Sequence, residues 1–105
     1  MHEQTFSVSA TQHRLLGKQV RLHFADGFVL KLTPAEASSL SFALVAVRAG
    51  ISPEREIYMS PIGSDAAFVG RVLDGGMSIS VPGGELEMDW AKVGILAESL
   101  AAAIG

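Results

Sequence analysis

The sequence predicts an α+β domain in which an antiparallel sheet of five to seven short strands packs against two helices. Two observations lead to this class. Short segments alternate apolar and polar residues, as half-buried strands do, and glycine-rich turns separate them. One order of elements also occurs twice, in residues 20–48 and 77–104: a strand, a tight glycine turn, a second strand and a capped apolar helix. We therefore expect two similar hairpin-helix (ββα) units in a single domain, residues 1–105.

The repeat is visible at the positions that a core would use. With an offset of 56 residues, Leu32 matches Met88, and the apolar positions of the two helices match as well. The matching helix positions are Ala37 with Val93, Leu40 with Leu96 and Leu44 with Leu100. A hairpin followed by a helix is a common supersecondary unit, so a true duplication and a chance similarity are both compatible with this match.

Hairpin geometry selects the turn of the first unit. Apolar residues alternate with polar ones on both strands, at Val20, Leu22 and Phe24 and again at Phe28, Leu30 and Leu32. The two apolar sets share one face only when the loop has three residues, 25–27, with Gly27 in the left-handed conformation. Phe24 then lies opposite Phe28, and Leu22 lies opposite Leu30.

The second hairpin fits a shorter turn. A two-residue loop at 83–84 pairs Val81 with Leu86 and Ile79 with Met88, which keeps these four apolar side chains on one face. We therefore expect a loop one residue shorter than that of the first hairpin.

Both helices carry clear boundary signals. The sequence Thr-Pro-Ala-Glu at 33–36 gives an N-cap, a proline at the first helical position and a glutamate that reaches back to the cap. The first helix then ends near Arg48, with Gly50 and Ile51 placed for a Schellman motif. Asp89 caps the second helix, which an alanine-rich run continues towards the C-terminus.

The remaining segments read as short strands and turns. Residues 6–10 alternate as an edge strand does, while 55–60 and 67–73 suit strands. The segment 61–65 is a turn or short loop, and 74–76 leads into the second hairpin.

The composition leaves apolar surface to be explained. Hydrophobic residues make up 49% of the chain and charged residues only 18%, against roughly a quarter charged in average domains. Each helix has one apolar stripe, formed by Ala37, Leu40, Leu44 and Val47 or by Val93, Leu96, Leu100 and Ile104. Further apolar residues lie off these stripes, at Phe42, Val45 and Ala49 and at Ile95 and Ala102. Either the two helices pack on each other, or the chain self-associates through its helix layer or a sheet edge.

Most of the patterns that mark catalysis or cofactor binding are missing from the sequence. There are no cysteines, so disulfides and thiolate metal sites are excluded. His2, His13 and His23 are ten or more residues apart, without ligand spacing beside a carboxylate. No Gly-x-Ser-x-Gly elbow is present, and the glycine pairs 75–76 and 83–84 lie within hairpins rather than in phosphate-binding loops. We predict no metal, no cofactor and no catalytic residue.

We expect no membrane association and a cytoplasmic location. No apolar run approaches the roughly 20 residues of a membrane-spanning helix. The first residues, Met-His-Glu-Gln-Thr, lack the basic and apolar regions of a signal peptide.

The first hairpin presents a small basic face. The chain as a whole is net negative, with eight Lys and Arg against eleven Asp and Glu, which argues against binding to a nucleic-acid backbone. The hairpin register nevertheless turns Arg21, His23 and Lys31 outward, with Arg21 directly opposite Lys31. Like charges paired across a hairpin cost stability. Three explanations of this pairing remain open. Glu54 or Glu56 on a neighbouring strand neutralises the positive charge, or the side chains are solvated. The third is that the face binds an anionic group or a partner.

The second hairpin presents the opposite charge. Ser78, Ser80 and Glu87 point outward, with Asp89 at the strand end. One hypothesis is therefore that the two faces meet across a subunit or partner interface. Trp90, directly after the Asp89 cap, is either a partner-binding anchor or packs back on the preceding hairpin.

These features favour a small non-catalytic protein-interaction or regulatory module. We expect it to form a homo-oligomer, in the first place a dimer, and to be able to bind another protein. Two alternatives remain: a nucleic-acid-binding domain that uses Arg21, His23 and Lys31, and a small-ligand-binding or enzyme domain with its site near 60–65.

Overall fold

The computed structural model describes residues 6–15, 17–24 and 27–105. Within these residues the chain forms seven strands and two helices, so the α+β class is confirmed. The elements are β1 (Phe6–His13), β2 (Gly17–Phe24), β3 (Val29–Leu32), α1 (Pro34–Arg48), β4 (Glu56–Met59), β5 (Phe68–Leu73), β6 (Gly76–Val81), β7 (Gly84–Asp89) and α2 (Trp90–Ile104).

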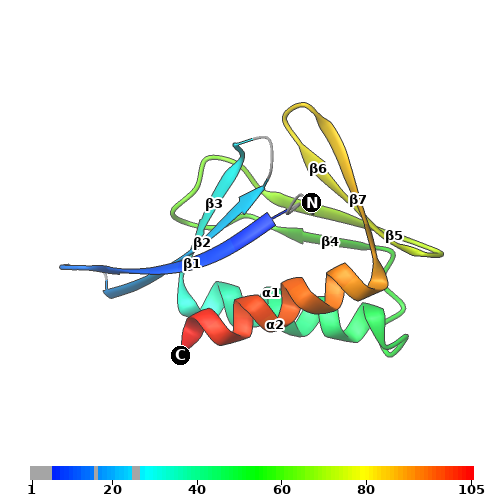
Figure 1. Cartoon of the computed structure of the whole chain (residues 1–105), viewed down its shortest axis with the longest axis horizontal. Helices are drawn as coiled ribbons and strands as arrows, with labels where there is room; N and C mark the ends of the chain where they lie inside the picture. The colour runs from blue at the N-terminus through cyan, green and yellow to red at the C-terminus, as the bar shows by residue number, and fades with distance from the viewer. Residues whose placement is uncertain (1–5, 16, 25–26) are drawn as a thin grey trace, which may run out of the picture.

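The expectation of a single sheet is wrong. Sheet A has the strand order β1-β2-β3 and sheet B the order β4-β5-β6-β7, with every pair antiparallel. Both sheets lie on the same side of the helix pair (Figure 1). A loop contact lies at the free edge of β3. The Ser64 hydroxyl accepts a hydrogen bond from the Lys31 amide (2.7 Å) and donates to the Lys31 carbonyl (3.3 Å), so a loop fills the edge where a fourth strand would pair.

The first hairpin has the predicted register. Leu22 lies opposite Leu30, and the Phe24 amide donates to the Phe28 carbonyl over 2.8 Å. Gly27 is left-handed with a φ of 86°, while residues 25 and 26 of the predicted loop lie outside the described residues. The two phenylalanine rings stack with centroids 5.8 Å apart.

The register of the second hairpin differs from the prediction by two residues. The predicted pairs, Val81 with Leu86 and Ile79 with Met88, are wrong: Val81 lies opposite Gly84, and Ile79 lies opposite Leu86. The turn is therefore at 82–83. Pro82 suits it because its ring fixes φ near the value that the first central position of a turn requires. A slip of two residues moves no side chain to the other face, so the apolar face is retained.

The ends of α1 are built as predicted. The Thr33 amide donates to Glu36 Oε1 (2.8 Å) and the Glu36 amide to Thr33 Oγ1 (3.1 Å), which completes the capping box. At the other end Gly50 has a φ of 74°, and the Ile51 amide donates to the Ala46 carbonyl over 3.0 Å. This is the Schellman pattern.

The other strands fall within about two residues of the predicted segments, except that β1 extends to His13. It pairs with β2 along its whole length and forms an edge of sheet A.

One core joins both sheets to the helix layer. The helices run antiparallel beneath the sheets (Figure 1), and Ser41 Oγ donates to the Ala97 carbonyl over 2.9 Å where they meet. The predicted stripes are buried, at Ala37, Leu40, Leu44 and Val47 and at Val93, Leu96 and Leu100, while Ile104 is partly buried. The helices therefore pack on each other as well as on the sheets. In the described chain neither helix combines the length and apolar character needed to cross a bilayer.

Candidate interaction surfaces

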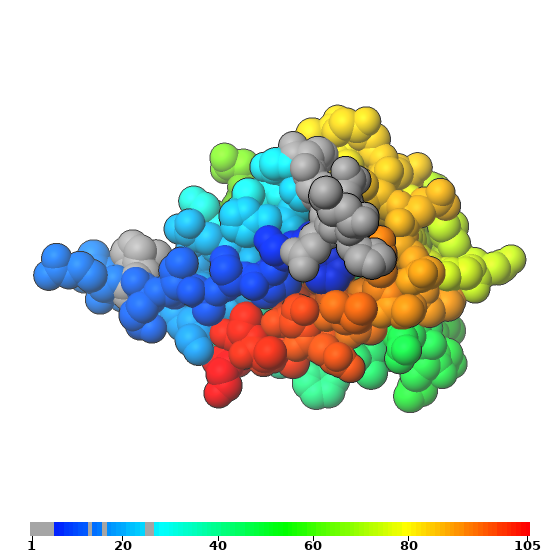
Figure 2. Space-filling view, viewed as in Figure 1, coloured from blue at the N-terminus to red at the C-terminus, as the bar shows by residue number. Residues whose placement is uncertain are grey.

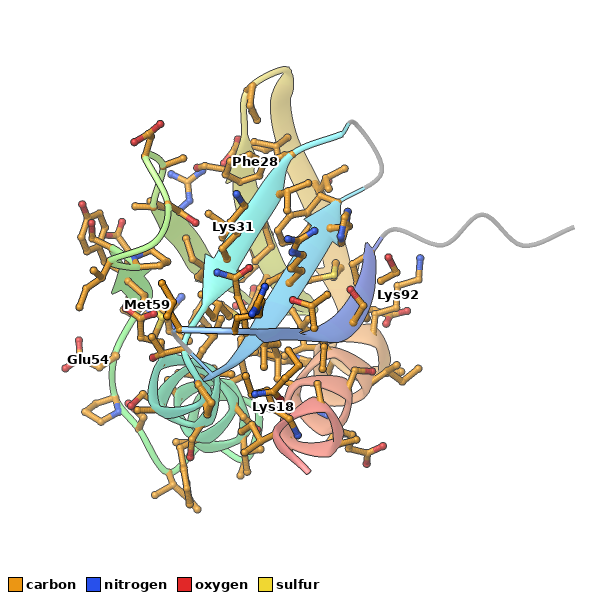
Figure 3. The ribbon with its side chains drawn as sticks, turned by 90° about the vertical axis from the view of Figure 1, so that its left-hand side faces the viewer. Lys18, Phe28, Lys31, Glu54, Met59 and Lys92 are labelled. Atoms are coloured by element: carbon orange, nitrogen blue, oxygen red, sulfur yellow. The ribbon has the colours of Figure 1, made fainter. Side chains whose placement is uncertain are left out.

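The basic face lies on the outer side of sheet A. Arg21 is directly opposite Lys31, as the hairpin register predicts, and Lys31 is exposed on β3 (Figure 3). Arg21 Nε donates to Gln19 Oε1 over 3.3 Å. Among the described residues no carboxylate lies within ion-pair distance of Arg21, His23 or Lys31. The cationic pair is therefore not balanced within the described part of the molecule.

The glutamates considered as partners for Arg21 are elsewhere. Glu56 lies in sheet B, opposite Arg71, and Glu54 precedes that strand outside both sheets. The hypothesis that a neighbouring strand balances the basic face is therefore wrong, because that strand belongs to the other sheet.

The outer side of sheet B carries the acidic face. Arg71 Nη2 lies 2.9 Å from Glu85 Oε1, and Ser78 Oγ donates to the same oxygen over 3.0 Å. Ser78 is consequently only 4% exposed although it points outward. Ser80 and Glu87 are exposed.

Asp89 and Trp90 both hold the start of α2. Asp89 Oδ1 accepts a hydrogen bond from the Lys92 amide over 2.8 Å. Trp90 packs against the core, its indole Nε1 donates to the Asp74 carbonyl (3.1 Å), and its own carbonyl accepts from Arg48 Nε (2.8 Å). These contacts tie α2 to the turn before β6 and to the end of α1.

The loop at 61–65 lies along the free edge of β3 in sheet A. Besides the Ser64 contacts, the Ile62 amide donates to Glu36 Oε2 over 3.0 Å, so one carboxylate serves both the α1 cap and this loop. A surface cleft of about 390 Å³ lies elsewhere, where Arg48, Arg55 and Trp90 contribute to its lining. In the described part of the chain no three potential ligands are grouped for a metal ion.

A second strip of side chains runs along the outer side of α1. We call the side chains of Ser38, Phe42, Val45 and Ala49 the α1 stripe; their spacing places them on one helix face. Phe42 is 75% exposed and Val45 is 50% exposed. Ser38, at one end, is small and partly buried. The α1 stripe is therefore uncharged, with two large apolar side chains at its centre and a small residue at each end.

The charged residues of α1 lie at the ends of the helix and bind other groups. Glu36 accepts from the Thr33 amide in the capping box, and Arg48 donates to the Trp90 carbonyl. Neither contact belongs to the α1 stripe.

Comparison with protein-family models, curated proteins and solved structures gives no match. The function has to be inferred from these surfaces.

Proposed function

We propose that the chain is a non-catalytic protein-interaction module that self-associates, and that two copies meet through the α1 stripe. One observation carries the proposal: Phe42 and Val45 stay exposed even though α1 and α2 pack on each other. Contact between the helices thus buries the main apolar stripe of each helix but leaves the α1 stripe exposed. Burying one large apolar side chain stabilises a contact by about 1.5–3 kcal/mol, which an isolated copy forgoes.

The pattern of the stripe supports a second copy as its occupant. Along the helix the side chains read small, large, large, small, at Ser38, Phe42, Val45 and Ala49, with spacings of four, three and four. This order of sizes is the same in both directions. When a two-fold axis relates two antiparallel copies of α1, Phe42 of each copy therefore lies opposite Val45 of the other, and Ser38 lies opposite Ala49. Such a contact must be self-complementary, and the absence of charge avoids repulsion between identical faces.

Native mass by light scattering tests this contact. We expect the variant F42S/V45S to have half the mass of the wild type, because serine removes the apolar side chains without disturbing the buried face. Y58S is the matched control, since Tyr58 is 66% exposed on β4 and its removal should leave the mass unchanged. A wild type that is monomeric, or a double variant with wild-type mass, would contradict the proposal.

We further propose that the two ββα units are a true internal repeat. Both helices have fifteen residues. The bond from Ser41 to Ala97 joins positions 56 residues apart, which is the offset of the repeat. This supports a local two-fold axis near the helix crossing, with β4 outside the repeat.

The unbalanced pair of Arg21 and Lys31 supports a second candidate function, nucleic-acid binding. Retention on immobilised DNA and RNA, with elution by salt, distinguishes nucleic-acid binding from self-association alone. The self-association proposal expects no retention near physiological salt. Retention that R21S/K31S abolishes would favour nucleic-acid binding, because backbone contacts depend on cations and weaken with salt.

Arg21 and Lys31 also test whether the basic face of one copy contacts the acidic face of another. In that case charge reversal in R21E/K31E lowers the native mass at low salt. An unchanged mass at low salt would count against such a contact.

A further inference from the structure

The two sheets have four edge strands, and three of them are protected from pairing with another chain. Ser64 covers β3 by binding both backbone groups of Lys31. β4 has only four residues and includes Glu56. β7 carries three acidic side chains, those of Glu85, Glu87 and Asp89. Cover, short length and charge are means by which proteins prevent edge-to-edge association.

Among the described residues, β1 shows none of these protections. Its eight residues, Phe-Ser-Val-Ser-Ala-Thr-Gln-His, include no lysine, no acidic residue and no proline. It pairs with β2 without a bulge, from Phe6 opposite Phe24 to His13 opposite Gly17. About half of the backbone N–H and C=O groups of an antiparallel edge strand point away from its neighbour. No backbone hydrogen bond from another described segment reaches this edge, and β1 runs across the face of the molecule above α2 (Figure 2).

We propose that β1 pairs antiparallel with β1 of a second copy, joining two copies of sheet A into one continuous sheet. The proposal rests on the proposed self-association and adds a second contact surface to it. A second copy fits this edge because identical uncharged strands meet without pairing like charges. From Phe6 to Gln12, β1 carries no charged side chain that would select an oppositely charged strand of a different protein.

The side-chain alternation sets the register. Residues directly opposite each other share a face, so the two-fold axis must pass through a residue position. With the axis at Ser9, every residue from Phe6 to Gln12 has a partner. Ser7 then faces Thr11 of the second copy on the outer side of the sheet, and Val8 faces Ala10 on the side of α2.

The two proposed contacts use different surfaces. β1 lies beside α2, whereas α1 packs near β4. One copy can therefore make both contacts at once. Most soluble homo-oligomers have closed symmetry, and the commonest closed form with two different two-fold contacts is a tetramer, so we expect the wild type to have the mass of a tetramer.

Disulfide cross-linking tests the β1 contact directly. The natural chain has no cysteine, so a single introduced cysteine reports on one contact. In S9C the two thiols lie opposite each other with Cα atoms about 4.5–5.5 Å apart, within the usual disulfide range of about 4.4–6.8 Å. We expect a covalent dimer on mild oxidation at micromolar protein. S80C is the matched control, since Ser80 is also an exposed strand serine. Cross-linking of S9C no faster than S80C overturns the proposal.

Charge placement tests the antiparallel register. In S7K/T11K a lysine faces a lysine on each side of the axis, and we expect the native mass to be halved. In S7E/T11K each lysine faces a glutamate of the other copy, and the mass should stay that of the wild type. Equal masses for these two variants would overturn the register.

The α1 contact is tested independently of the β1 contact. F42S/V45S lowers the mass if the α1 stripe is used, but leaves cross-linking of S9C intact. A failure of the α1 proposal and a failure of the β1 proposal therefore give different results.

Discussion

Gly76 is the residue whose small size the fold most clearly requires. A Cβ there would collide with the Met88 carbonyl and lie 2.8 Å from the Asp89 Cα, both backbone atoms of the paired strand. We expect G76A to lose about 1–3 kcal/mol of unfolding free energy or more, as overpacked sites do. Urea unfolding measures this loss.

The neighbouring glycine is the control for this prediction. A Cβ on Gly75 meets nothing within 4 Å, and its φ is ordinary. G75A should therefore change stability little. Equal losses in the two variants would show that the turn, rather than the close approach of β7, sets the cost.

Single residues could be predicted from the sequence where their signal was local. Thr33 with Glu36, Gly27 and Gly50 were all found because caps and turns depend on neighbours a few residues away. The contact between Ser64 and Lys31 was not predicted, because the two residues are 33 positions apart in the chain. Nothing distinguishes the Ser64 hydroxyl from that of other loop serines until the chain is folded.

At the scale of the elements, the helix crossing makes the repeat testable. Ser41 Oγ is buried and donates to the Ala97 carbonyl, so S41A should lose about 0.5–1.5 kcal/mol. If a two-fold axis relates the helices, a serine at position 97 can donate back to the carbonyl of residue 41. S41A/A97S should then regain most of the loss in thermal or urea unfolding. No recovery would contradict the internal axis.

Element type was easier to predict than element pairing. Apolar alternation distinguishes the two faces of a strand but not registers that differ by two residues, which is how the pairing of Val81 with Leu86 came to be expected. The division into two sheets could not be predicted from the sequence, for a related reason. Whether β3 and β4 pair depends on what covers the free edge of β3, and no periodicity encodes that.

For the candidate surfaces, the sequence predicted the positions of the side chains but not their surroundings. Phe42 and Val45 were placed off the buried stripe, and both are exposed. Trp90 and Asp89 were recognised at the start of α2, whereas the bond from the indole to the Asp74 carbonyl required the folded chain. The open edge of β1 became evident only when all four edges could be compared.

On the scale of the whole molecule, self-association links stability to concentration. A copy bound at a hundred-fold excess over the dissociation constant stabilises the native state by about 2.7 kcal/mol. We expect the melting temperature of the wild type to rise as protein concentration is raised a hundred-fold. The combined variant F42S/V45S/S7K/T11K lacks both proposed contacts and should melt at one temperature throughout. A concentration-independent wild type would argue against any assembly.

The loop over β3 has a further consequence for how long the protein survives in solution. Three hydrogen bonds between side chain and backbone, two between Ser64 and Lys31 and one from the Ile62 amide to Glu36, hold this loop against sheet A and the start of α1. Brief local opening there uncovers the backbone of β3 while the core stays intact, since local openings cost less than global unfolding. We therefore expect the lifetime of the protein at elevated temperature to depend on how often this loop opens, so that a more stable core would extend it little.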